Sequence, residues 1–222
     1  MTSLEVTTGD RPEFSVIWLH GLGADGHDFE PIVPELRLPD TLPTRFIFPN
    51  APMAPVTING GYVMPAWYDV ISQNLGEMED EKGIRASRHA LEALIQKEEA
   101  RGIPSRRVIL AGFSQGGAIA LFTALRFPRP LGGVLALSTY LPLPEKLDME
   151  AHASNATLPI FMGHGRMDGV ITLAQGAAAR DLLMRKGNRV VWREYAMAHS
   201  VCPEEIADIG AWLGETLANC KG

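Results

Sequence analysis

The sequence has little cysteine. Its 222 residues include two cysteines, Cys202 and Cys220, which do not form a CxxC pair. A small disulfide-dense scaffold is therefore excluded, because such scaffolds rely on several paired cysteines. One disulfide is possible, but two free thiols in a reducing cytoplasm are the favoured interpretation. No His-x-x-x-His or Cys/His cluster has ligand spacing, so we expect no metal site.

The sequence also lacks an excess of positive charge and a long hydrophobic run. Acidic residues outnumber basic ones by 26 to 20, which gives a net charge of −6. A nucleic-acid-binding protein usually shows a basic stripe or excess. No apolar run approaches the roughly 18 residues that a membrane span requires, and the first residues lack the regions of a signal peptide. We therefore expect a cytoplasmic protein with no nucleic-acid partner and no stable membrane insertion.

The composition itself is that of an ordinary folded protein. Hydrophobic residues make up 46% and charged residues 21% of the chain, which excludes wholesale disorder. A chain of this length buries about 70% of its surface on folding, enough for a large core without metals or disulfides. The sequence shows no internal repeat and no low-complexity tract. We expect a single domain over residues 1–222.

Strand-like and helix-like segments alternate along most of the chain. Several of the apolar segments are hydrophobic at nearly every position, as expected of parallel strands that are buried on both faces. The expected strands are 14–20, 45–48, 107–113, 133–138, 159–164 and 189–195. Helical patterns cover a segment around 84–95 that ends at Gly102, and also 115–127, 173–186 and 204–218. This alternation predicts an α/β fold: a mostly parallel central sheet with helices on both faces.

Residues 49–79 interrupt the alternation with several prolines and glycines. Long irregular loops in compact domains are often functional. We expect this loop to pack on the body of the protein and to form part of a binding cleft. Met53, Met64 and Trp67 could line that cleft, because thioethers and aromatic rings adapt to varied acyl groups. Alternatively, these side chains only pack within the loop.

The candidate nucleophile is Ser114. Gly112-Phe113-Ser114-Gln115-Gly116 matches G-x-S-x-G, and it lies directly between an expected strand and a helix of small residues. A sharp strand-to-helix turn needs glycine on both sides, and it lifts the serine hydroxyl above the edge of the sheet. The positive end of the following helix then points at the reacting centre. An incidental serine in a glycine-rich turn is the alternative, which this context disfavours.

The partners of Ser114 follow by elimination. Folds that carry their serine on such a strand-to-helix turn, called a nucleophile elbow, supply these partners in the chain order Ser, acid, His. Asp168 follows the strand 159–164 at the tip of the sheet, whereas Asp148 comes one strand too early and Asp181 lies within a helical pattern. With Asp168 as the acid, His199 is the remaining base. His164, at the end of its strand, is expected to be structural and to shape the acid loop.

His20-Gly21-Leu22-Gly23 ends the first expected strand, where such a turn supplies one oxyanion-hole N–H. By position, the two donors are the backbone amides of Leu22 and Gln115. The stretch from Gly21 to Gly26 also matches the dinucleotide-binding pattern G-x-G-x-x-G. That alternative lacks an acidic residue at the end of the next strand, which closes with Pro49-Asn50. It also leaves the serine, acid and histidine unexplained.

Taken together, these segments resemble the phospholipase/carboxylesterase family over residues 14–214. The block Val56–Tyr62 is especially close to the bacterial carboxylesterase branch, and mammalian acyl-protein thioesterases are more distant relatives with the same core motifs. The resemblance is carried by Val16–Gly23, Phe48–Pro52, Val56–Tyr62, Pro65–Asp69, Gly112–Gly117, Ala136–Tyr140, His164-Gly165 with Asp168, Met197–Ser200 and Asp208–Leu213. It implies an α/β-hydrolase fold with little or no cap domain and no cofactor. Its triad corresponds to Ser114, Asp168 and His199, its oxyanion donors to Leu22 and Gln115, and its active-site tryptophan to Trp67.

The implied activity is hydrolysis of small-molecule carboxylic esters, with short to medium acyl chains and broad specificity. The alternative is a lysophospholipase or acyl-protein thioesterase that uses the same triad. A non-catalytic binding module on a degenerate hydrolase fold is a third interpretation, which the complete set of catalytic residues disfavours. Bacterial members of the family are often dimers, so a homodimer is one possible assembly. Residues 144–158 and the neighbours of Asp168 in 166–170 match the family less well.

Overall fold

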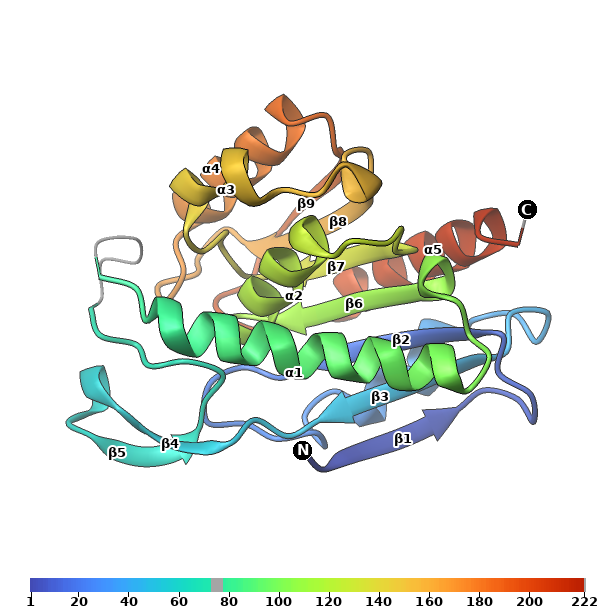
Figure 1. Ribbon diagram of the computed structural model, residues 1–222, viewed down its shortest axis with the longest axis horizontal. Coiled ribbons are helices and arrows are strands. Elements are labelled where there is room, and N and C mark those ends of the chain that lie inside the picture. The colour runs from blue at the N-terminus through green and yellow to red at the C-terminus, as the bar shows by residue number, and fades with distance from the viewer. Residues whose placement is uncertain (73–77, 222) are drawn as a thin grey trace.

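The structure, a computed structural model, describes residues 1–72 and 78–221 (Figure 1). Its main feature is a seven-stranded sheet in the order β1-β3-β2-β6-β7-β8-β9. The parallel strands are β2 (Phe14–Leu19), β3 (Thr44–Pro49), β6 (Val108–Phe113), β7 (Gly133–Leu137), β8 (Pro159–Gly165) and β9 (Arg189–Tyr195). At one edge, β1 (Ser3–Thr7) pairs antiparallel with β3.

Helices cover both faces of the sheet (Figure 1). One face packs against α1 (Glu81–Ala100), α2 (Gln115–Arg126) and α4 (Leu173–Arg185). The other packs against α5 (Pro203–Asn219) and the 3₁₀ segment η1 (Glu30–Leu36). Because both faces are covered, every residue of β2 and β7 is buried. The predicted mostly parallel sheet with helices on both faces is confirmed.

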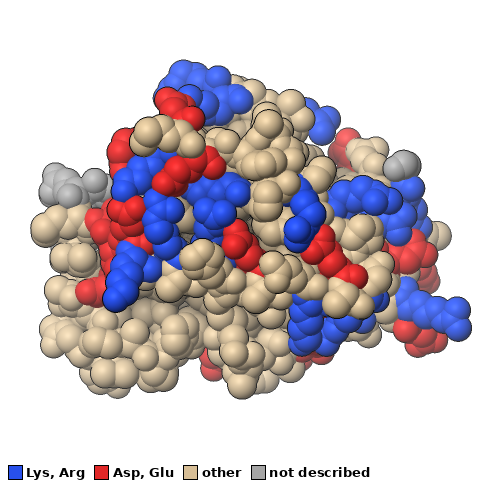
Figure 2. All heavy atoms as spheres, viewed as in Figure 1, with Lys and Arg blue, Asp and Glu red and all other residues tan. Residues whose placement is uncertain are grey.

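The connection between β7 and β8 is built from short elements. It holds η4 (Pro144–Lys146), α3 (Leu147–Glu150) and η5 (Ala153–Asn155), while η3 (Ser105–Arg107) precedes β6. Ion pairs tie α1 to other parts of this face: Arg85 reaches Glu150 at 2.5 Å and Glu99 reaches Arg129 at 2.7 Å. Figure 2 shows that positive and negative side chains are mixed on this face, without a basic stripe.

Two regions differ from the sequence-based expectation. The edge strand β1 was not predicted, because only Leu4 and Val6 are apolar in it. Residues 49–79 were expected to be irregular, but they contain a hairpin of β4 (Met53–Val56) and β5 (Tyr62–Pro65) around η2 (Thr57–Asn59). Its prolines are tolerated because a separate two-stranded ribbon leaves many backbone groups unpaired. Residues 73–77 of that segment lie outside the described residues.

The first turn of α5 carries a buried acid, Glu205. Neither of its carboxylate oxygens has a hydrogen-bond partner within the described part of the chain. The side chain packs against Gly163 of β8, where any larger residue would collide with it. Burial, reinforced by repulsion from Asp208, raises the pKa of Glu205 to about 8. The carboxyl group is therefore mainly protonated in the folded protein at neutral pH.

We expect Glu205→Gln to be increasingly stabilising, relative to the unsubstituted protein, as the pH rises from 5 to 9. Because the pKa of Glu205 is raised in the folded protein, its contribution to the free energy of unfolding is complete below the ordinary glutamate value near 4.5. That contribution is lost as the pH rises from there through about 8. Glutamine removes this loss, which amounts to at most about 5 kcal/mol. Urea unfolding at three pH values measures it, with the exposed neighbour Glu204→Gln as control. If the difference in free energy of unfolding between Glu205→Gln and the unsubstituted protein does not change with pH, the raised pKa of Glu205 is contradicted.

Candidate active site

Ser114 lies at the sharp turn between β6 and α2. Its backbone angles are φ 54° and ψ −121°, in the left-handed region that a non-glycine residue adopts at a cost. The turn is held by the Ser114 N–H, which donates to Leu137 O of the neighbouring strand at 2.9 Å. A Cβ at Gly112 would collide with the backbone of Gly116, and a Cβ at Gly116 would collide with Leu19. The two glycines thus permit the close approach of strand and helix that presents the hydroxyl.

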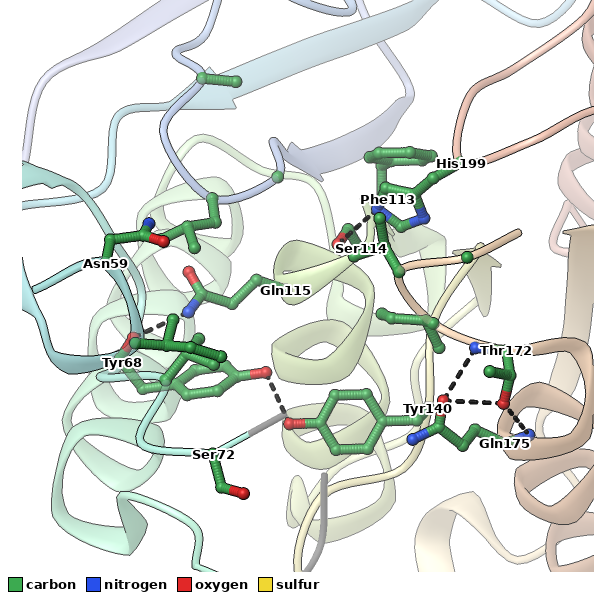
Figure 3. A pocket seen from close by; sticks show the side chains of 18 of the residues that line it. Asn59, Tyr68, Ser72, Phe113, Ser114, Gln115, Tyr140, Thr172, Gln175 and His199 are labelled. Carbon is green, nitrogen blue, oxygen red and sulfur yellow. Dashed lines mark hydrogen bonds between the residues drawn. The ribbon is translucent and has the colours of Figure 1, made fainter. Parts of the chain in front are cut away.

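The structure brings Ser114, His199 and Asp168 into one hydrogen-bonded chain. Ser114 Oγ lies 2.9 Å from His199 Nε2 (Figure 3). His199 Nδ1 lies 2.7 Å from Asp168 Oδ2. The histidine comes from the loop between β9 and α5, and the aspartate comes from the loop after β8. The ring of His199 also packs on Phe113, with 4.7 Å between ring centroids. Three segments far apart in sequence therefore meet at the carboxyl end of the sheet.

The Asp168 carboxylate is fixed through both of its oxygens. Oδ1 accepts from the backbone N–H groups of Val170 and Ile171, each at 2.9 Å. Oδ2 faces His199, and the side chain is fully buried. Below this loop, His164 Nε2 donates to Ile171 O at 2.8 Å, and its ring stacks on Trp192. The loop that carries the acid is thus supported from beneath by the second histidine.

These contacts determine which nitrogen of His199 carries a proton. An ionised Asp168 can only accept, so Nδ1 must donate to it. In the neutral ring, Nε2 is then the free acceptor, and it faces the Ser114 hydroxyl. This arrangement lets His199 receive a proton from Ser114.

The two expected oxyanion donors, Leu22 and Gln115, both line the cavity beside Ser114. Gln115 is the first residue of α2, so its N–H has no acceptor within the helix. Its side chain also has a role: Oε1 accepts from Trp67 N at 2.8 Å and Nε2 donates to Tyr68 O at 2.7 Å. The elbow is therefore joined directly to the segment that follows β5.

The turn that carries Leu22 is held by the neighbouring His20. Ala51 N donates to His20 Nε2 at 3.1 Å, so the proton of a neutral ring is on Nδ1 and is donated to Gly21 O at 2.7 Å. Burial lowers the pKa of His20, which favours this neutral form. Trp67 Nε1 donates to His20 O at 2.9 Å. These bonds fix the backbone of the turn that carries Leu22, one of the two expected oxyanion donors.

A cavity of about 910 Å³ opens beside Ser114 and His199 (Figure 3). It is lined by Gly21, Leu22, Ala24, Asp28, Ile58, Asn59, Tyr68, Val70, Ser72, Phe113, Ser114, Gln115, Tyr140, Gly169, Val170, Ile171, Thr172, Gln175 and His199. Segment 49–79 contributes to this wall, as expected. Phe113, Tyr140 and Ile171 were missed, although each lies near the carboxyl end of a strand, where sites in such sheets form.

The three expected cleft residues lie elsewhere, and none lines this cavity. Met53, on β4, is 63% exposed. Met64, on β5, receives a weak hydrogen bond from Asn59 and packs near Gly23. Trp67 is buried, and its indole N–H donates to His20 O. Ile58 and Asn59, at the turn of the hairpin, line the cavity instead.

Over the described ranges, no three His, Cys, Asp or Glu side chains are grouped so that they could hold a metal ion. Both cysteines are free thiols. Within residues 1–72 and 78–221, no helix is both long and apolar enough to cross a membrane.

The sheet, the elbow and the hydrogen-bonded chain define a serine hydrolase with the α/β-hydrolase fold. The family model for phospholipase/carboxylesterase matches residues 2–217. The chain therefore belongs to the phospholipase/carboxylesterase family.

Relatives of known name are similar over most of their length. Acyl-protein thioesterase 1 of Neurospora crassa is 41% identical over 216 residues, covering 93% of this chain and 88% of the relative. The protein of the same name from Yarrowia lipolytica is 38% identical over 208 residues, with 91% and 92% covered. Among solved structures, Zea mays acyl-protein thioesterase 2 has a TM-score of 0.85 at 30% identity, covering 97% of this chain and 99% of that chain. Arabidopsis thaliana SOBER1 has a TM-score of 0.86 at 31% identity, with 92% and 99% covered.

Proposed function

We propose that this protein hydrolyses small-molecule carboxylic esters, with short to medium acyl chains and broad specificity, through an acyl-enzyme on Ser114. The observation that carries the proposal is the continuous chain from Asp168 through His199 to Ser114, which ends in the cavity of about 910 Å³. A serine hydroxyl is a weak nucleophile until a base removes its proton, and here that base is held at 2.9 Å.

In the first half-reaction, Ser114 Oγ attacks the ester carbonyl carbon while His199 Nε2 takes the hydroxyl proton. Asp168 stabilises the resulting imidazolium through Nδ1–H without becoming protonated itself. The carbonyl oxygen becomes an oxyanion, toward which the backbone N–H groups of Leu22 and Gln115 donate. The tetrahedral intermediate then collapses, the bond to the leaving oxygen breaks, and His199 returns the proton to the departing alcohol.

In the second half-reaction, water takes the place of the alcohol. His199 removes a proton from the water as its oxygen attacks the acyl carbon, and the same two amides hold the second oxyanion. Collapse releases the carboxylic acid and returns the proton to Ser114 Oγ. Each oxyanion-hole donor typically contributes about 10²- to 10³-fold to such a reaction.

The cavity wall supports a preference for modest acyl groups of varied shape. Val170 is 64% exposed and Ile58 is 36% exposed, so part of the apolar lining faces solvent. An acyl chain on such a wall is only partly removed from water, and each further methylene gains less than the roughly 0.8 kcal/mol of full burial. Long chains therefore gain less here than in a closed tunnel.

Hydrolysis of acyl thioesters is the second candidate. It is supported by the names of relatives, because several proteins that are 37–41% identical to this chain are acyl-protein thioesterases. The same nucleophile, base and oxyanion donors act on a thioester, in which the leaving atom is sulfur. A lysophospholipid is a further substrate that the same groups could cleave.

A matched chain-length series separates these activities. We would measure kcat/KM for p-nitrophenyl esters from acetyl to palmitoyl and for S-acyl N-acetylcysteamine thioesters with the same acyl groups. We expect ester hydrolysis with a maximum at about two to six carbons, because the wall is partly exposed. A maximum at eight or more carbons, or consistently faster thioester turnover, would favour the second candidate. No turnover of either series would contradict both.

A further inference from the structure

The cavity beside Ser114 has a pair of hydroxyl groups that the hydrolysis scheme does not use. Tyr68 and Tyr140 both line the cavity, and their hydroxyl oxygens lie 2.9 Å apart. Tyr68 follows β5 and Tyr140 follows β7, and both side chains point into the same part of the cavity (Figure 3). Both residues are buried. The phenols therefore form a polar spot on a wall that also carries Val70 and Ile171.

Counting protons shows that this pair retains hydrogen-bonding capacity. Two phenols carry two protons, and the bond between them uses one. Burial raises the pKa of both tyrosines, so neither proton is lost at neutral pH. If Tyr140 donates to Tyr68, the proton left over belongs to Tyr68, which lines the cavity. If Tyr68 donates instead, its oxygen still offers a lone pair.

A buried acid lies beside the pair. The Glu79 carboxyl lies next to the Tyr140 hydroxyl, and its Oε2 accepts from Leu143 N at 2.9 Å. Its Oε1 is buried and has no partner within the described residues. Burial raises the pKa of Glu79. Either phenol can be the donor in the bond between Tyr68 and Tyr140.

The geometry of the reaction places the acyl chain toward these phenols. In the tetrahedral intermediate, the leaving oxygen must lie near His199 Nε2 and the oxyanion near Leu22 and Gln115. The acyl chain takes the remaining direction, away from His199. In the view of Figure 3, Tyr68 and Tyr140 lie on the side of Ser114 opposite His199. The distal part of an acyl chain therefore runs toward them.

We propose that Tyr68 and Tyr140 determine specificity by selecting acyl chains that carry a neutral polar group, a ketone or a hydroxyl, beyond the reacting carbonyl. This inference rests on the proposed ester hydrolysis. A polar acyl group completes the hydrogen bonding of the phenols, whereas a plain alkyl chain covers them and leaves that capacity unused. Both phenols are placed for recognition, and neither takes part in the transfer of protons at Ser114.

The test compares matched esters in matched variants. We would measure kcat/KM for three pairs of p-nitrophenyl esters: pentanoate with 4-oxopentanoate, hexanoate with 5-oxohexanoate, and heptanoate with 6-oxoheptanoate. The ratio of the oxo ester to the plain ester would be determined in the unsubstituted protein, Tyr68→Phe and Tyr140→Phe. Comparing ratios between proteins cancels the intrinsic reactivity of each ester. We expect each substitution to lower the ratio roughly three- to tenfold for at least one pair, the effect of one neutral hydrogen bond.

Tyr195→Phe is the matched control, because the Tyr195 hydroxyl donates to Asp208 at 2.8 Å and does not line the cavity. It should leave all three ratios unchanged. The inference stands if Tyr68→Phe or Tyr140→Phe lowers the ratio in a folded protein. Melting temperatures identify a variant that has not folded. Ratios that are unchanged or higher in the folded variants would overturn it. Absence of turnover of every plain ester would instead overturn the proposed hydrolysis.

Discussion

Replacing Ser114 with alanine is expected to lower kcat by about 10⁴- to 10⁶-fold on every ester that the protein hydrolyses. The variant keeps His199, Asp168 and the oxyanion donors, but it has no atom that can form the acyl-enzyme. Water alone must then attack the substrate. The fold should persist, because the turn is held by the Ser114 N–H and by the flanking glycines rather than by the hydroxyl.

The measurement is the initial rate with the best ester of the chain-length series, together with a circular dichroism melt. Ser154→Ala is the control, since Ser154 is exposed and lies on η5, outside the cavity. We expect it to match the unsubstituted protein. A folded Ser114→Ala variant that keeps more than a tenth of the activity would show that another group carries the chemistry.

Asp168→Asn is expected to lower kcat by about 10⁴-fold, the size of the effect in serine proteases. The asparagine carbonyl can still accept from Val170 and Ile171, which leaves its NH₂ group facing His199 Nδ1. Nδ1 must then accept, so the proton moves to Nε2, and the ring can no longer take the proton of Ser114. The loss comes from the wrong tautomer, with the heavy atoms almost unmoved.

A second aspartate provides the control for this substitution. Asp181 lies on α4 with an exposed side chain that pairs with Arg180. Asp181→Asn should leave kcat and KM unchanged. Equal activity losses in the two variants would indicate general destabilisation, and full activity of Asp168→Asn would rule out Asp168 as the orienting acid.

The sheet and the elbow could be predicted from sequence because their signals are local. Strands buried on both faces are continuous apolar runs, and β2, β6, β7 and β8 were recognised in that way. The glycines at 112 and 116 are required by close backbone contacts within the same strand–turn–helix unit. Chain order then reduced the choice of acid and base to one pair, and the structure places Asp168 and His199 within hydrogen-bonding distance.

The hairpin could not be predicted because its strands pair only with each other. β4 and β5 contain Pro55 and Pro65, which argue against a strand in the interior of a sheet, and many of their residues are exposed. The composition of this segment indicated contact with substrate but not which side chains make it. Only the folded hairpin shows that Met53 faces solvent and that Ile58 and Asn59 border the cavity.

The phenol pair was equally hidden in the sequence. Tyr68 and Tyr140 are separated by 72 positions, and each taken singly is an ordinary aromatic residue of a loop. Their contact depends on how the segment after β5 docks on the elbow through Gln115, which is a tertiary contact. Sequence periodicity describes which face of an element is buried, but not which side chains from separate elements meet.

The most direct test of the account is the site of covalent attachment by diethyl p-nitrophenyl phosphate, which phosphorylates an activated serine. Peptide mass spectrometry of the labelled protein should find one diethylphosphate per chain, on the peptide that contains Ser114, and no label in Ser114→Ala. Labelling should be much slower in Asp168→Asn, because the base is then in the wrong tautomer. Attachment to a different residue, or none at a reagent excess that inactivates the protein, would contradict the claim that Ser114 is the nucleophile.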